Sequence, residues 1–258
     1  MSKEKLSTKQ DSEAFELSVG QQIMRRLMRT ESYTGAVRRG IDVVKWKRAN
    51  ERLHSYAQLR GSEFTVVQIG ANDGVHSDPV RPFVEQYGWK GVLVEPVPDH
   101  YHRLQETYAG HKNISLVNSA ISDQEGVRTM YAALDLPDGR GNPLRGKDSF
   151  DYETVAKHDL QVSDVDAFIE PIDVPTMRLE TLLEQQAVEC IDYLAVDTEG
   201  HDGVVLSQLD MDRYRPKFIL FEHCHLGPEE NDEIASNLER FGYQSTRMRR
   251  DTFAERAA

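Results

Sequence analysis

Apolar residues recur at helical spacing in the first 60 residues of the chain. One stripe follows steps of four residues, and a second stripe comes after Thr34-Gly35. An apolar residue every three to four positions predicts an amphipathic helix, and the glycine predicts a break between two helices. We therefore expect a helical extension over residues 1–60. The stripes consist of Phe15, Val19, Ile23 and Leu27 in the first helix, and of Val37, Ile41, Val44, Leu53 and Tyr56 in the second.

From residue 61 onwards, short apolar runs alternate with amphipathic segments. The apolar runs predict strands at 64–69, 91–94, 114–117, 191–196 and 218–221. The amphipathic segments predict helices at 79–87, 99–108, 203–209 and 231–241. Strands that are apolar along their whole length and alternate with helices are typical of a mostly parallel sheet covered on both faces. We predict an α/β domain over residues 61–258.

The alternation fails between about residues 134 and 170. This stretch is rich in Gly, Pro and Asp, and it follows the third predicted strand and precedes the fourth. A long irregular segment inside a compact domain is usually functional or disordered. Two interpretations follow: a lid or substrate-recognition insert over the ligand edge of the sheet, or a surface loop without a role.

Charge and composition exclude several classes of partner. The net charge of −12 argues against nucleic acid and against an anionic membrane surface, because both require a basic face. No stretch approaches the ~20 apolar residues that span a bilayer. The polar start of the chain argues against a secretory signal, and two cysteines suggest buried thiols in a reducing compartment, so we expect a cytoplasmic protein. Basic residues on the N-terminal helices allow a nucleic-acid arm, but they favour a solvated face or a homodimer contact.

The first predicted strand ends in a turn with two glycines, Gly70-Ala71-Asn72-Asp73-Gly74. Such a turn lets a ligand approach the backbone closely, although its spacing differs from the G-x-G-x-x-G of dinucleotide sites. Glu95 follows the second strand, 95 − 70 = 25 residues later. A carboxylate at this place has two oxygens that can accept hydrogen bonds from ribose hydroxyls. The pair predicts a site for an adenosine-containing cofactor, with Ser119 and Ala120 after the third strand near the adenine.

Acidic and imidazole side chains follow the fourth and fifth predicted strands. Asp197, Glu199 and His201 come after the fourth strand, and His223 comes with Glu222 and His225 at the end of the fifth. Because parallel strands end at the same edge of a sheet, we expect these groups to meet there. Imidazole titrates near neutrality, which suits a general base. Such a cluster could bind Mg²⁺ or a transition ion, but no ligand spacing requires it, and we assign no metal ligands.

Taken together, the motifs resemble the FkbM family of S-adenosylmethionine-dependent methyltransferases. The resemblance runs from about residue 64 to 225, with Gln68 near the place where the family usually has an acidic residue. The matching motifs are Val67-Gln68-Ile69-Gly70-Ala71-Asn72-Asp73-Gly74, Glu95-Pro96-Val97-Pro98, Val117-Asn118-Ser119-Ala120-Ile121-Ser122, Thr176-Met177-Arg178-Leu179-Glu180-Thr181-Leu182 and Asp197-Thr198-Glu199-Gly200-His201-Asp202.

The resemblance implies a class I, Rossmann-like sheet that binds S-adenosylmethionine. It also implies a methyl acceptor that is a hydroxyl of a sugar, polyketide or other small metabolite. The expected cofactor-binding residues are Gly70, Ala71, Asn72, Gly74, Glu95, Ser119, Ala120 and Asp197, and the expected catalytic residues are Asp197, Glu199, His201 and His223.

Two rival hypotheses remain at this stage. An NAD-linked oxidoreductase on a similar sheet would require G-x-G-x-x-G, which the chain lacks. A non-catalytic binding module could keep the fold without the activity, but the intact glycine turn and Glu95 argue against it.

Overall fold

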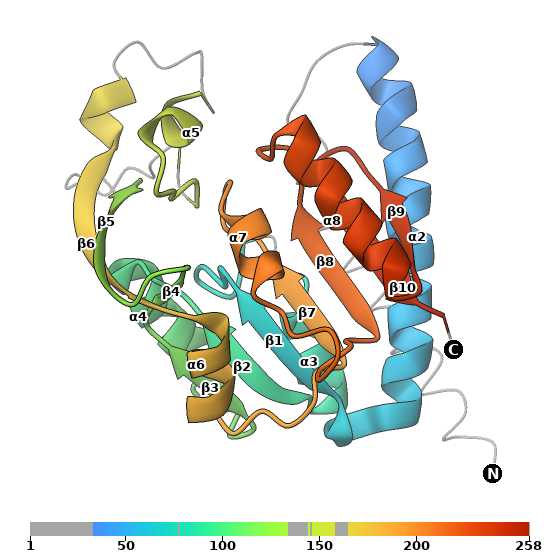
Figure 1. Ribbon diagram of the computed structural model, residues 1–258. Coiled ribbons are helices and arrows are strands. Elements are labelled where there is room, and N and C mark those ends of the chain that lie inside the picture. Colours follow the sequence, from blue (N-terminus) through green and yellow to red (C-terminus); the bar gives the residue numbers. More distant parts are fainter. Residues whose placement is uncertain (1–32, 77, 134–143, 145, 158–164, 258) are drawn as a thin grey trace.

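The structure is a computed structural model, and it describes residues 33–76, 78–133, 144, 146–157 and 165–257. The first of the two expected N-terminal helices, with Phe15 to Leu27, lies outside these residues. The described chain forms one large sheet with helices on both faces and a smaller sheet beside it (Figure 1).

The large sheet has seven strands in the order β3-β2-β1-β7-β8-β10-β9. All neighbours pair in parallel except β10, which runs antiparallel to both β8 and β9. The expected mostly parallel sheet is therefore confirmed, and its five predicted strands all form. The strands are β1 (Thr65–Ile69), β2 (Lys90–Val94), β3 (Ile114–Val117), β7 (Tyr193–Val196), β8 (Phe218–Glu222), β9 (Tyr243–Arg247) and β10 (Asp251–Arg256).

Six helices cover the two faces of this sheet. Because successive residues of a strand point to opposite faces, Val66 packs on one side of β1 and Val67 on the other. The side of Val66 is covered by α2 (Tyr33–Arg60), α3 (Arg81–Tyr87) and α4 (Pro98–Thr107). The side of Val67 is covered by α6 (Leu179–Gln185), α7 (Asp202–Ser207) and α8 (Pro228–Arg240).

Helix α2 differs from the expected pattern in its buried stripe. It spans Tyr33–Arg60 and so includes Thr34 and Gly35, and the chain before Tyr33, on the other side of the predicted break, lies outside the described residues. A glycine costs a helix only about 1 kcal/mol, which burial elsewhere along α2 can offset. The buried stripe consists of Trp46, Ala49, Leu53 and Ala57, whereas Val44 of the expected stripe is 49% exposed. This described part of the extension packs in the same core cluster as the sheet.

A second, three-stranded sheet lies beside the large one and was not predicted. Its order is β4-β6-β5, and β5 runs antiparallel to β6. It consists of β4 (Ala120–Ile121), β5 (Gly126–Ala132) and β6 (Glu170–Met177). Within the expected insert at 134–170, the described residues form α5 (Tyr152–Ala156) and the 3₁₀ turn η2 (Val165–Phe168). Another 3₁₀ turn, η1 (Gly61–Glu63), lies far from the insert in sequence and follows α2.

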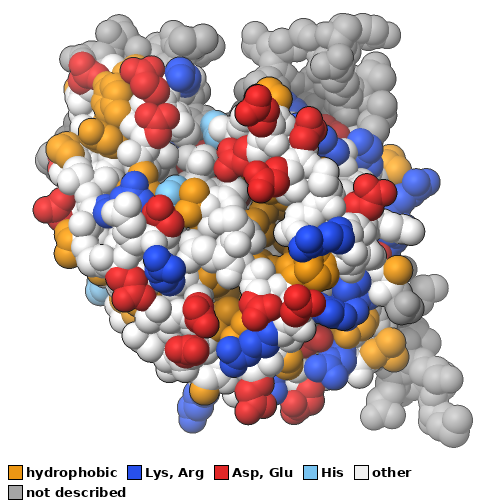
Figure 2. All heavy atoms as spheres, in the orientation of Figure 1, with side chains coloured by type: hydrophobic (Ala, Val, Ile, Leu, Met, Phe, Trp, Pro, Cys, Tyr) orange, Lys and Arg blue, Asp and Glu red, His pale blue; other side chains and the backbone are white. Residues whose placement is uncertain are grey.

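Further observations concern the cysteines, the described helices and the surface. Cys190 and Cys224 are free and exposed, so the expectation of buried thiols is wrong, because both lie in connections outside the strands. None of the described helices carries an apolar stretch that could cross a bilayer. In Figure 2 acidic and basic side chains are interspersed over the face shown, and the surface is hollowed between the small sheet and α8.

Candidate active site

The glycine turn joins three neighbouring strand ends. Gly70 has φ +82°, and a Cβ added to it would lie 2.0 Å from the carbonyl oxygen of Asp197. Only glycine fits this close approach of the ends of β1 and β7. On the other side, the N–H groups of Gly70 and Ala71 both donate to the carbonyl oxygen of Val94, at 2.9 and 3.0 Å. The structure thus brings the expected residues Gly70, Ala71 and Asp197 together at the carboxyl edge of the sheet.

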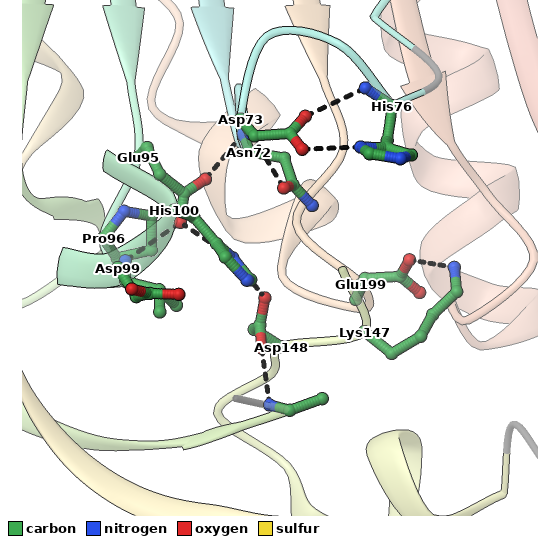
Figure 3. A network of polar contacts seen from close by, with 12 residues as sticks. Asn72, Asp73, His76, Glu95, Pro96, Asp99, His100, Lys147, Asp148 and Glu199 are labelled. Atoms are coloured by element: carbon green, nitrogen blue, oxygen red, sulfur yellow. Dashed lines mark hydrogen bonds and ion pairs between the residues drawn. The ribbon is translucent and has the colours of Figure 1, made fainter. Parts of the chain in front are cut away.

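Glu95 follows β2 directly and lies against this turn (Figure 3). Its carboxylate is buried, and it accepts hydrogen bonds from the N–H of Asn72 at 2.7 Å and from the N–H of Val97 at 2.9 Å. Burial raises the pKa of Glu95 to about 7, an effect that nearby His100 and these two N–H groups oppose. A titratable carboxylate is therefore held in a fixed orientation at the place where the sequence predicts ribose recognition.

Three of the expected cofactor residues, Gly74, Ser119 and Ala120, pack against other parts of the protein. Gly74 packs on α4, where an added Cβ would lie 2.7 Å from the ring of Tyr108. The hydroxyl of Ser119 is buried and donates to the carbonyl oxygen of Pro175 at 3.0 Å. Ala120 begins β4 and pairs with Thr176 of β6. These contacts place Gly74, Ser119 and Ala120 in the walls around the edge.

Gln68 lies two residues before Gly70 and makes a buried contact of its own. Its amide donates to the Oδ1 atom of Asp78 at 3.2 Å, and Asp78 also accepts from the hydroxyl of Tyr108. Asp78 is buried, which raises its pKa to about 6. Where the FkbM family usually has an acid, this chain therefore has an amide that is bonded within the protein.

Three carboxylates meet where β7 and β8 end. Oxygens of Asp197, Glu199 and Glu222 lie within 4.8 Å of one another, and Glu199 and Glu222 are buried. Crowding of buried carboxylates is unfavourable unless positive groups pair with them. Arg250 does so, with Nε 2.8 Å from Glu222 Oε1, and Lys147 forms an ion pair with Glu199. The spacing could also accommodate a metal ion, but these cations already offset much of the negative charge.

His225 joins this cluster, although it was not among the expected catalytic residues. Its Nε2 atom lies 3.1 Å from Glu199 Oε2 and 3.4 Å from Glu222 Oε2. Arg250 also donates towards the same ring at 3.2 Å. The arrangement links the ends of β7 and β8 through one imidazole.

His223 points elsewhere, contrary to the expected convergence. Its Nε2 atom accepts a hydrogen bond from Arg247 Nε at 2.9 Å, and its Nδ1 atom is 3.0 Å from Thr252 Oγ1. Glu222 is the last residue of β8 and His223 follows it, and the two side chains bind different partners, Arg250 and Arg247. Burial and the charge of Arg247 lower the pKa of His223 to about 4, and the ring therefore stays neutral near neutral pH.

His201 lies at the start of α7, with its ring centroid 5.0 Å from that of Phe150. Burial and then the charge of Arg128 lower its pKa to about 4. For both His201 and His223, the expectation of an imidazole that titrates near neutrality is therefore wrong. Desolvation, which the sequence alone does not reveal, is the larger cause in each case.

The last acid of the Asp197–Asp202 motif stabilises the local backbone. Asp202 is fully buried, and its Oδ2 atom accepts from the N–H and the hydroxyl of Thr198 at 3.1 and 2.7 Å. Its Oδ1 atom accepts from the N–H of Glu222 at 2.9 Å. Asp202 thus joins the loop after β7 to the end of β8 and sets the distance between the carboxylates that follow each strand.

Three residues near this edge were not predicted from the sequence: Lys147, Arg250 and His100. Arg250 lies between β9 and β10, two strands that the apolar pattern did not predict. Lys147 lies in the Gly- and Pro-rich insert, where no periodicity indicates which side chains face the sheet. His100 occupies a buried position on α4, and burial could have been predicted only from its spacing to Leu104.

The strand order, the helices on both faces and the glycine turn beside Glu95 define a class I, Rossmann-like methyltransferase fold. The model of the methyltransferase FkbM domain matches residues 68–245, and the chain belongs to this family. The resemblance that the motifs indicated is therefore confirmed.

Several solved structures are similar to the chain at low identity. The FkbM methyltransferase from Methylobacillus flagellatus KT matches with 10% identity and a TM-score of 0.46, over 74% of this chain and 43% of that one. Precorrin-6y C5,15-methyltransferase from Geobacter metallireducens GS-15 matches with 9% identity and a TM-score of 0.36, over 74% and 77%. The N-terminal domain of human METTL16 in complex with SAH matches with 10% identity and a TM-score of 0.40, over 81% and 70%. A comparison with curated proteins finds no match.

Proposed function

We propose that this protein transfers a methyl group from S-adenosylmethionine to a hydroxyl of a small metabolite, such as a sugar or a polyketide. The observation that carries the proposal is the buried carboxylate of Glu95, held by the N–H of Asn72 beside a turn that only glycine can form at Gly70. Membership of the FkbM methyltransferase family supports methyl transfer as the reaction class.

On the cofactor side, residues of this chain would bind and orient S-adenosylmethionine. Each oxygen of Glu95 accepts one backbone N–H and has capacity for a further hydrogen bond, which two ribose hydroxyls would donate. Gly70 has no side chain to keep a ligand from the turn, and Ser119 and Ala120 would lie in the wall for the adenine. Bound S-adenosylmethionine would supply an electrophilic methyl group, and the protein's contribution is alignment with the acceptor.

On the acceptor side, the protein must accept the hydroxyl proton as the new bond forms. We assign this role to Asp197, because it is the one carboxylate of the cluster that is not buried. Glu199 and His225, held 3.1 Å apart, would orient the acceptor. His201 is the second candidate for the base, and His223 is committed to Arg247 and Thr252.

Calorimetric titration of the full chain with S-adenosylmethionine and with NAD tests the cofactor. We expect binding of S-adenosylmethionine and none of NAD; binding of NAD alone would favour the oxidoreductase. Turnover is then measured with methyl-labelled cofactor and a metabolite extract as the source of acceptors. Binding of S-adenosylmethionine without any transfer would favour a non-catalytic module.

The variant Asp197→Asn tests the base. It keeps the size of the side chain, so cofactor affinity should persist while turnover falls by roughly a hundredfold to ten-thousandfold, the usual contribution of a general base. The matched control is Asp212→Asn, an exposed acid paired with Arg215. Equal turnover of the two variants would contradict the assignment. Because we assign no metal ligands, we expect a chelator to leave turnover unchanged.

A further inference from the structure

A short piece of the insert, Gly146–Ser149, touches the candidate site at three places. The first contact is with the glycine turn. Gly146 has φ +76°, and a Cβ added to it would lie 2.5 Å from the side-chain nitrogen of Asn72. The carbonyl oxygen of that same amide accepts the N–H of Asp73 at 2.7 Å, so the Asn72 side chain is held in place from within its turn. The insert therefore lies directly against the residue whose N–H bonds Glu95.

The second contact reaches Glu95 through a buried histidine, His100 of α4 (Figure 3). The Nδ1 atom of His100 lies 3.2 Å from Asp148 Oδ2 and 4.0 Å from Glu95 Oε1. The ring is 1% exposed, and both carboxylates are also largely buried. Asp148 is in turn fixed by the N–H of Ala133, which donates to its Oδ1 atom at 2.8 Å. In its protonated form, the imidazole of His100 would offset the mutual repulsion of these two carboxylates, which is strong where water is excluded.

The third contact is with the acceptor side. Lys147 pairs with the carboxylate of Glu199, and the hydroxyl of Ser149 donates to the carbonyl oxygen of Glu199 at 2.8 Å. The backbone of Ser149 also pairs with Tyr131 of β5, at 2.8 and 3.1 Å, which anchors the segment to the small sheet. Consecutive residues of one segment thus hold both halves of the ligand edge.

We propose that Gly146–Ser149 is a positioning segment for the cofactor, and that His100 is the positioning residue that transmits its effect to Glu95. The inference rests on the proposed function, because Glu95 is the residue that would bind the ribose. Without His100, no imidazole would lie between the carboxylates of Glu95 and Asp148. Glu95 would then favour its protonated form, which is a poorer acceptor for two hydroxyls.

The first test is a double-mutant cycle of His100→Gln and Glu95→Gln, read as the affinity for S-adenosylmethionine by calorimetry. We expect each single variant to bind roughly tenfold more weakly, because Glu95→Gln removes the charge of the acceptor and His100→Gln favours the protonated form of Glu95. The double variant should bind no more weakly than Glu95→Gln, because His100 acts through the carboxylate. Losses that simply multiply in the double variant would overturn the role of His100.

The pH dependence of the same binding gives a second readout. The groups that face Glu95 are His100 from α4, Asp148 from the insert, and the N–H groups of Asn72 and Val97. In His100→Gln, affinity should recover at alkaline pH, where Glu95 ionises without help. A defect of packing would weaken binding equally at every pH, and that result would contradict the proposal.

The contact of Gly146 is tested by a matched pair of glycine variants. Gly146→Ala and Gly242→Ala both place alanine at a positive φ, +76° and +82°, but nothing lies within 4 Å of an added Cβ at Gly242. Both variants should lose similar stability, and only Gly146→Ala should bind S-adenosylmethionine several-fold more weakly. Unchanged affinity of Gly146→Ala, with binding by the unaltered protein, would overturn this inference alone. Absence of binding by the unaltered protein would overturn the proposed function and the inference with it.

Discussion

Replacement of Glu95 by Gln should weaken two pH dependences of opposite sign. As the pH rises, the unaltered protein should lose stability and gain affinity for the cofactor, and Glu95→Gln should show less of either change. Glu95 is 4% exposed, and burial raises its pKa from 4.5 to about 7. The folded protein therefore holds this proton more tightly than the unfolded chain does. The stabilisation is fully present below pH 4.5 and is lost as the pH rises through 7.

The size of this effect follows from the shift in pKa. A shift of one unit corresponds to about 1.4 kcal/mol, so the shift of Glu95 contributes on the order of 3 kcal/mol between pH 4.5 and 8. Glutamine cannot titrate, and the free energy of unfolding of Glu95→Gln should fall less over this range than that of the unaltered protein. Asp78, whose pKa is raised to about 6, titrates in both proteins and cancels in the difference.

Cofactor binding should behave in the opposite way. The ionised carboxylate accepts hydroxyl donors, so the affinity of the unaltered protein for S-adenosylmethionine should increase as the pH rises through about 7. Glu95→Gln should bind more weakly, with little dependence on pH.

The assay combines urea unfolding and calorimetric titration at pH 5, 6, 7 and 8, values chosen roughly to bracket the titration. Glu106→Gln is the matched control, because Glu106 is an exposed acid on α4 that is paired with His102. Its curves should follow those of the unaltered protein. If Glu95→Gln retains the same pH slope of stability as the unaltered protein, Glu95 does not carry the raised pKa and the reasoning fails.

Three further predictions concern the core, the site loop and His201. Leu53→Ala should lower the free energy of unfolding by about 2–5 kcal/mol, whereas Leu59→Ala, at an 85% exposed position of the same helix, should change it little; equal denaturation midpoints would show that α2 is not part of the core. Asp202→Ala removes the acceptor of three hydrogen bonds and should destabilise the protein by several kcal/mol in urea unfolding, roughly 1 kcal/mol or more for each buried donor left unpaired. His201 is neutral when folded because its pKa is lowered from 6.5 to about 4, so His201→Ala should reduce the stability lost as the pH falls from 6.5 to 4, while turnover persists; a loss of turnover of a hundredfold or more would make His201 the base.

Two expectations from the sequence stay predictions. The basic residues of the N-terminal region predicted a solvated face or a homodimer contact, and the described part of α2 uses its apolar stripe within the chain. Measurement of molar mass in solution decides between the two. The insert at 134–170 was expected to act as a lid or as an inert loop, and amide exchange of its residues with and without cofactor separates these outcomes.

The local sequence determined the five parallel strands of the large sheet and the edge at which the site lies. Val66 to Ile69 form a buried strand because every position is apolar or paired, and Gly70 ends it because no side chain fits beside Asp197. Glu95 was found for a similar reason: its distance from Gly70 is fixed by one strand–helix–strand unit. These features depend on neighbours along the chain, so periodicity and turn chemistry are sufficient to predict them.

The tertiary structure alone decided which side chains share the site. Glu222 and His223 are adjacent in sequence, yet they bind different partners, and Arg250 reaches Glu222 only because β10 pairs with β8. The pKa of His223 depends on Arg247, which is 24 residues away in sequence. Pairing between distant segments and the exclusion of water set these charges, and neither is encoded in the local pattern of apolar and polar residues.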